Sequence, residues 1–146
     1  MRLNTSASVI SFAKQLEADS AAFYEKMAER YPKAAELFLD FSKGNKKYTT
    51  MIERAYYGVI TDAIEGCFAF GVETDKYTFE REPAKGPGYA DVLNQAIDME
   101  QKLISFYTDA AEQSEAFMAD VPRTFLIVAR KRKDRKDKLG TLLRET

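Results

Sequence analysis

Two stretches of the chain repeat each other: QLEADSAAFYEKMAE over Gln15–Glu29 and DMEQKLISFYTDAAE over Asp98–Glu112. At an offset of 83 residues they share the pairs Glu17/Glu100, Phe23/Phe106, Tyr24/Tyr107, Ala28/Ala111 and Glu29/Glu112. A second match, at an offset of 87 residues, aligns Phe38-Leu39 with Phe125-Leu126. The repeat predicts two related helical hairpins that pack about a pseudo-two-fold axis.

Apolar residues around these stretches recur every three or four positions, which is the periodicity of an amphipathic helix. In the first helix they are Val9, Phe12, Leu16, Phe23 and Met27. The periodicity predicts four helices, over about 6–31, 33–57, 89–113 and 121–144, with Pro32 suited to the first turn of the second helix. Residues 58–88 form a crossover that is too long for an ordinary loop and is expected to contain a short helical turn. We therefore predict an all-α single domain over 1–146, an antiparallel four-helix bundle of two hairpins joined by a long crossover.

The composition excludes several classes of functional site. The chain has no histidine and one cysteine, Cys67. Histidine-based catalysis, histidine-ligated metal or haem and all-cysteine metal sites are thus excluded. With 22 basic and 23 acidic side chains the net charge is −1, which indicates no electrostatic partner for the whole chain. No apolar run reaches the roughly 18 residues of a membrane-spanning helix, and no secretory pattern is present, so we expect a cytoplasmic protein without a membrane partner.

Two carboxylates fall in the middle of apolar helix faces. Positions three, four and seven residues from Glu100 are apolar, and most of those around Glu17 are too. A buried, ionised carboxylate needs a compensating group. The candidates on the apolar faces of the other two helices are Asn45 with Tyr48 and Arg132 with Arg135. The alternatives are that Glu17 and Glu100 lie at partly exposed helix flanks and that the arginines belong to a solvated face.

This arrangement resembles the rubrerythrin-like branch of the ferritin-like superfamily. The Glu followed seven residues later by Tyr occurs twice, as Glu17/Tyr24 and Glu100/Tyr107. The resemblance implies a diiron site built from one Glu on each of two helices and a Glu-x-x-His pair on each of the other two. The chain departs from that pattern, because all four residues of the two pairs are replaced, by Asn45, Tyr48, Arg132 and Arg135.

The replacements indicate a metal-free protein with a vestigial site. Arginine is permanently charged and can pair with carboxylates in the place of metal cations. We therefore expect a non-catalytic protein without cofactor, which has a structural or interaction role and forms a homodimer. One alternative is a diiron oxidase or peroxidase that binds iron through unusual ligands. Another is a binding module that uses the basic stretch Arg130–Lys138, of net charge +5, although nucleic acid is not an expected partner.

Overall fold

A computed structural model describes residues 1–58, 70–86, 88–115 and 120–146. Within them the chain forms four long helices, α1 Ser6–Arg30, α2 Ala35–Tyr57, α4 Tyr89–Ser114 and α5 Asp120–Arg144. The predicted bounds agree with these to within two residues. The side chain of Thr5 caps the start of α1 by accepting a hydrogen bond from the Ser8 backbone N–H at 3.2 Å. Pro32 opens a 3-10 turn, η1 Pro32–Ala34, which separates α1 from α2.

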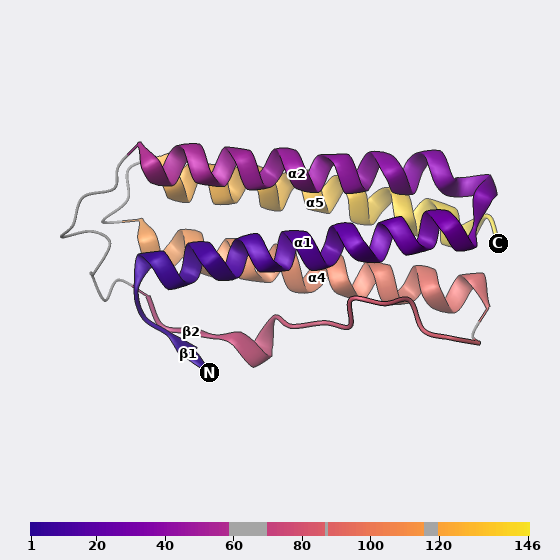
Figure 1. Ribbon diagram of the computed structural model, residues 1–146, viewed down its shortest axis with the longest axis horizontal. Coiled ribbons are helices and arrows are strands. Elements are labelled where there is room, and N and C mark those ends of the chain that lie inside the picture. The colour runs from indigo at the N-terminus through magenta and orange to yellow at the C-terminus, as the bar shows by residue number, and fades with distance from the viewer. Residues whose placement is uncertain (59–69, 87, 116–119) are drawn as a thin grey trace.

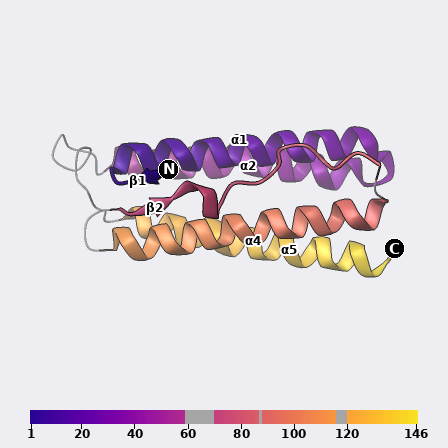
Figure 2. The ribbon, with the colours of Figure 1, turned by 90° about the horizontal axis from the view of Figure 1, so that it is seen from below.

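The helices pack in two hairpins, α1 with α2 and α4 with α5 (Figure 1). The two helices of each hairpin run in opposite directions, whereas α2 and α4 run in the same direction because the crossover returns along the bundle (Figure 1). The two hairpins lie side by side, with α1 next to α4 and α2 next to α5 (Figure 1, Figure 2). The prediction of a helical chain with paired helices is therefore confirmed. None of the helices in the described ranges is both long and apolar enough to cross a membrane.

The all-α prediction holds for the architecture, and the structure adds a small two-stranded sheet that was not predicted. Strand β1 Arg2–Leu3 pairs antiparallel with β2 Val72–Glu73, with Arg2 opposite Glu73 and Leu3 opposite Val72. Through this pairing the first residues of the chain are hydrogen-bonded to the crossover. Strands of two residues are too short to show an alternating pattern, so hydrophobic periodicity does not predict them.

The described part of the crossover, residues 70–86, runs along the side of the bundle formed by α1 and α4 (Figure 2). The short helical turn predicted there is present as η2 Thr74–Lys76. The Tyr77 hydroxyl donates to Asp109 of α4 at 2.5 Å, and Arg30 of α1 donates to the Ala84 carbonyl at 2.7 Å. Cys67 lies outside the described residues, as do residues 59–66, 68 and 69.

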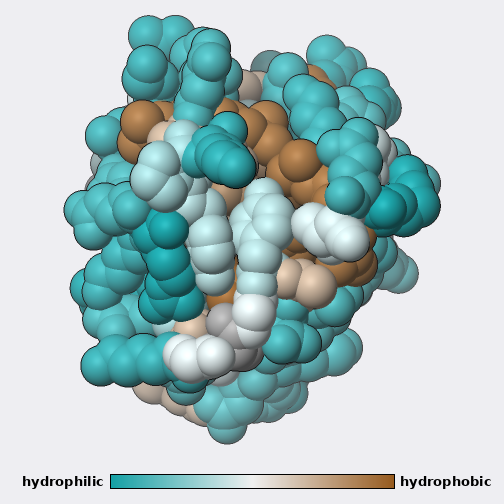
Figure 3. Space-filling model, turned by 90° about the vertical axis from the view of Figure 1, so that its right-hand side faces the viewer, coloured by the Kyte–Doolittle hydropathy of each residue, from teal (hydrophilic) through white to brown (hydrophobic). Residues whose placement is uncertain are grey.

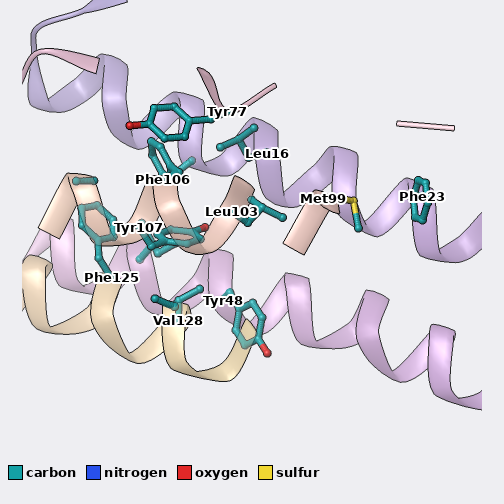
Figure 4. Packing of buried hydrophobic residues seen from close by; sticks show 14 of the residues in the cluster. Leu16, Phe23, Tyr48, Tyr77, Met99, Leu103, Phe106, Tyr107, Phe125 and Val128 are labelled. Carbon is teal, nitrogen blue, oxygen red and sulfur yellow. The ribbon is translucent and has the colours of Figure 1, made fainter. Parts of the chain in front are cut away.

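The core fills the space between the four helices. Apolar side chains from both hairpins pack together there, and the Phe106 ring lies against those of Tyr77, Tyr107 and Phe125 (Figure 4). The Phe12 ring of α1 also contacts Phe106. At the end of the bundle near η1 and the C-terminus, hydrophobic residues are visible at the surface between hydrophilic ones (Figure 3). Several polar side chains are buried in the core, and four of them are charged: Glu17, Glu100, Arg132 and Arg135.

Candidate functional site

Arg132 of α5 lies between the two buried carboxylates. Its Nε and Nη2 donate to the two oxygens of Glu17 on α1, at 3.2 and 2.7 Å, which is a bidentate pair. Its Nη1 donates to Oε1 of Glu100 on α4 at 2.6 Å. Arg132 and Glu100 are 0% exposed and Glu17 is 1% exposed. One guanidinium group therefore bridges both hairpins at the centre of the bundle.

Arg135, one turn further along α5, supplies the second cation. It donates to the Asn45 side-chain oxygen and, at 2.9 Å, to the Phe41 carbonyl, both on α2. Its Nη1 lies 3.7 Å from Glu100 Oε2. The guanidinium carbon is 4.6 Å from the centre of the Phe41 ring and 5.2 Å from that of Tyr48, distances at which a cation interacts with an aromatic face. Arg135 therefore places a second positive charge near Glu100, and residues of α2 surround its guanidinium group.

Asn45 and Tyr48 complete the cluster on α2. The Asn45 Oδ1 accepts from both arginines, at 3.2 Å from Arg132. The Tyr48 hydroxyl lies 3.5 Å from Arg135, and its ring lies 5.5 Å from the Arg132 guanidinium carbon. The two neutral side chains therefore provide acceptors and a ring face to cations that come from α5.

Two tyrosines donate to the carboxylates in a reciprocal way. Tyr24 of α1 donates to Glu100 of α4, and Tyr107 of α4 donates to Glu17 of α1 at 2.5 Å. The cause is geometric: seven residues span about two helical turns, and α1 and α4 run antiparallel. At the level where α1 and α4 pass each other, the tyrosine two turns beyond the glutamate of each helix lies beside the glutamate of the other helix. The repeat in the sequence corresponds to a repeated pair of hydrogen bonds.

The electrostatics of the cluster follow from its burial. Burial and the neighbouring charge of Glu100 raise the pKa of Tyr24 well above its usual value, and burial and the charge of Glu17 do the same for the pKa of Tyr107. Burial by itself would lower the pKa of Arg132. The negative charges of Glu100 and Glu17 outweigh it and hold that pKa well above its usual value. Both tyrosines stay neutral and Arg132 stays charged.

The structure brings together all six residues singled out from the sequence, Glu17, Asn45, Tyr48, Glu100, Arg132 and Arg135. The alternatives of partly exposed glutamates and solvated arginines are wrong for these four charged residues. Sequence reasoning missed Ser20, whose hydroxyl lies 3.5 Å from Arg132, and Gly44, where a β-carbon would lie 2.6 Å from Arg135 Nη2. A glycine inside the second helix was the only signal for that close approach.

The donor set does not fit a diiron centre. The oxygens of Glu17 and Glu100 already accept from Arg132, Tyr24 and Tyr107. A metal ion beside these carboxylates would share its cavity with two guanidinium groups, which is electrostatically unfavourable. In the described ranges, His, Cys, Asp and Glu side chains form no group of three or more that could hold a metal ion.

The arrangement therefore pairs both buried carboxylates with guanidinium groups. Two carboxylates and two guanidinium groups sum to zero charge inside the bundle.

Comparisons with known proteins found no match: no family model, no curated protein and no solved structure matches the chain.

Proposed function

We propose that the chain is a ferritin-like protein of the rubrerythrin-related type in which arginine has replaced metal at the centre of the bundle. It acts without catalysis, as a structural or interaction protein. The observation that carries the proposal is the position of Arg132, hydrogen-bonded to Glu17 and Glu100 from opposite hairpins. These two glutamates correspond to the lone carboxylates of a diiron bundle, on the first and third long helices.

The chemistry of the cluster supports a structural role. A buried carboxylate that loses its cation is strongly destabilising, so each bridge joins the helices that supply it. Arg132 joins α5 to α1 and α4, and Arg135 joins α5 to α2. The cluster holds all four helices in one arrangement, and such an arrangement presents a fixed outer surface to a partner.

Metal analysis of the purified protein tests the proposal. We expect less than one equivalent of iron, manganese or zinc per chain after dialysis against a chelator. One or two tightly held metal ions per chain would refute it and favour the diiron oxidoreductase with unusual ligands.

A gain-of-metal variant tests the same site from the opposite direction. Asn45→Glu, Tyr48→His, Arg132→Glu and Arg135→His together restore two Glu-x-x-His pairs opposite Glu17 and Glu100. Without metal the added carboxylates repel each other, so the variant is less stable than the original chain. Fe²⁺ or Mn²⁺ bound by the folded state restores its thermal midpoint, and the original chain shows no such shift. A folded variant whose midpoint ignores both metals would show that these positions do not form a ferritin-like site.

The proposal includes a homodimer. Two leucines at equivalent positions of the repeat, Leu39 on α2 and Leu126 on α5, are 44% and 48% exposed. Analytical ultracentrifugation tests the assembly: we expect a dimer that dissociates when both leucines are changed to glutamate. A monomer at all concentrations would refute this part alone.

The basic surface of α5 favours a second candidate, a binding module for an anionic partner. Arg130, Lys131 and Lys133 are exposed beside the two buried arginines. Binding of nucleic acid that weakens steeply with salt would support this candidate. Binding that is absent at low salt would exclude it.

A further inference from the structure

A groove of about 490 Å³ lies between α1 and α2, on the outer side of the charged cluster. The wall on α1 consists of three alanines flanked by charged residues: Ala18, Ala21 and Ala22 with Lys14, Glu17 and Glu25. Asn45, Lys46 and Thr49 of α2 line the other wall. The volume is in the range of small-molecule sites, and the wall of methyl groups gives it an apolar surface. The groove is thus suited to a small, largely apolar molecule.

A buried donor at the floor of the groove lacks a partner. Asn45 is 1% exposed, and its Nδ2 makes no hydrogen bond to any described residue. Its Oδ1 is turned toward Arg132 and Arg135, so Nδ2 occupies the other side of the amide, and Asn45 lines the groove. An unsatisfied buried donor costs about 1–3 kcal/mol, and an acceptor that arrives through the groove offsets that cost.

Lys46 places a cation next to this donor. It is exposed and makes no ion pair within the part of the chain that the structure describes, whereas Lys14, at the same groove, pairs with Glu53 at 3.0 Å. Of the two acidic residues on the α1 wall, Glu17 is paired with Arg132, and Glu25 accepts from the Ser42 hydroxyl at 2.9 Å. The amide N–H and the ammonium group on the α2 wall, opposite the three alanines, match a carboxylate at the end of a hydrocarbon body.

We propose that this groove binds a small apolar carboxylate. One carboxylate oxygen accepts from Asn45 Nδ2, the ammonium group of Lys46 pairs with the carboxylate, and the hydrocarbon part packs on Ala18, Ala21 and Ala22. The ligand fills the one hydrogen bond that the central cluster leaves open on α2, so binding also stabilises the contact between α2 and α5 through Asn45.

Isothermal titration of the full chain with octanoate and with octan-1-ol tests the proposal. We expect saturable binding of octanoate, and Ala22→Phe, which fills the groove at a half-buried position, weakens it by about tenfold or more. The matched control is Ala90→Phe, at a half-buried position of α4 that does not line the groove, and it leaves the affinity unchanged. The absence of saturable binding, or equal loss in both variants, would overturn the proposal.

A second pair of variants tests the charge of the ligand. Lys46→Met removes the cation, so the preference for octanoate over octan-1-ol shrinks by about two- to fivefold, as expected for an exposed ion pair. Lys43→Met removes an exposed lysine of α2 outside the groove and keeps the preference. In nuclear magnetic resonance spectra the Asn45 side-chain amide shifts on addition of octanoate. Equal affinity of the original chain for acid and alcohol, or an unmoved Asn45 amide, would overturn the assignment. None of these readouts depends on metal content, so they are separate from the test of the metal-free function.

Discussion

Replacing Arg132 by methionine removes the cation that both buried carboxylates share while leaving an unbranched side chain in its place. The guanidinium group donates three hydrogen bonds to carboxylate oxygens, at 2.6, 2.7 and 3.2 Å. Hydrogen bonds to charged groups contribute about 1.5–3 kcal/mol each. Because the buried guanidinium also carries a desolvation cost, the expected net loss is about 3–5 kcal/mol, the usual effect of breaking a buried pair. A domain has about 5–15 kcal/mol of stability in total, so the variant lies close to unfolding.

Urea unfolding followed by far-ultraviolet circular dichroism measures this loss. The matched control is Arg130→Met, an exposed arginine on the same helix, for which the change stays within about 0.5 kcal/mol. Equal unfolding free energies for the two variants at pH 7 would refute the buried ionic cluster.

Three further predictions concern the groups around the arginines. Tyr24→Phe and Tyr107→Phe each remove a hydroxyl that donates to a buried carboxylate. Each change therefore lowers the free energy of unfolding, measured by urea titration, by about 1.5–3 kcal/mol. Unequal losses would contradict the equivalence of the two tyrosine–glutamate hydrogen bonds. Both tyrosines have raised pKa values, so above pH 10 the unfolded chain loses protons that the folded chain keeps, and stability falls by up to about 1.4 kcal/mol per pH unit for each tyrosine. Tyrosinate absorbance that develops fully before the helical signal is lost would contradict this. Gly44→Ala places a β-carbon 2.6 Å from Arg135 Nη2, so we expect it to lower the thermal midpoint. The control is Gly140→Ala, where the nearest atom to the new β-carbon is 3.6 Å away, and it raises the midpoint because alanine has the higher helix propensity. The reverse order of midpoints would refute the close approach of Arg135 to Gly44.

The helices and the central cluster could be predicted from the sequence because both depend on one-dimensional patterns. Apolar residues at three- and four-residue steps define a helix wherever it packs, so the third helix, predicted over 89–113, is observed as Tyr89–Ser114. A carboxylate in the middle of an apolar face, such as Glu100, requires a cation, and Arg132 occupies the same kind of position on another helix. The resulting pair is present as predicted.

The remaining features depend on how distant segments are placed relative to each other. Strands β1 and β2 pair residues about 70 positions apart, Arg2 with Glu73, and nothing in either dipeptide specifies the other. The exchange of partners between Tyr24 and Tyr107 requires the level at which α1 passes α4, which periodicity does not give. The need for glycine at position 44 could not be predicted, because it arises only from the contact with the Arg135 side chain of another helix.

The distribution of charge between the hairpins gives the cluster a role in specifying which helices meet. The α1–α2 hairpin buries Glu17 and no cation in the cluster, and the α4–α5 hairpin buries Glu100 with Arg132 and Arg135. The repeat makes the two hairpins alike in shape, so shape alone would let two copies of the same hairpin pair. Pairing two α1–α2 hairpins would bury two carboxylates with no guanidinium group, and pairing two α4–α5 hairpins would bury an excess of positive charge. Each costs several kcal/mol per uncompensated ion. Only the pairing of unlike hairpins is neutral, so the arginines on α5 select the observed arrangement over the symmetric alternatives.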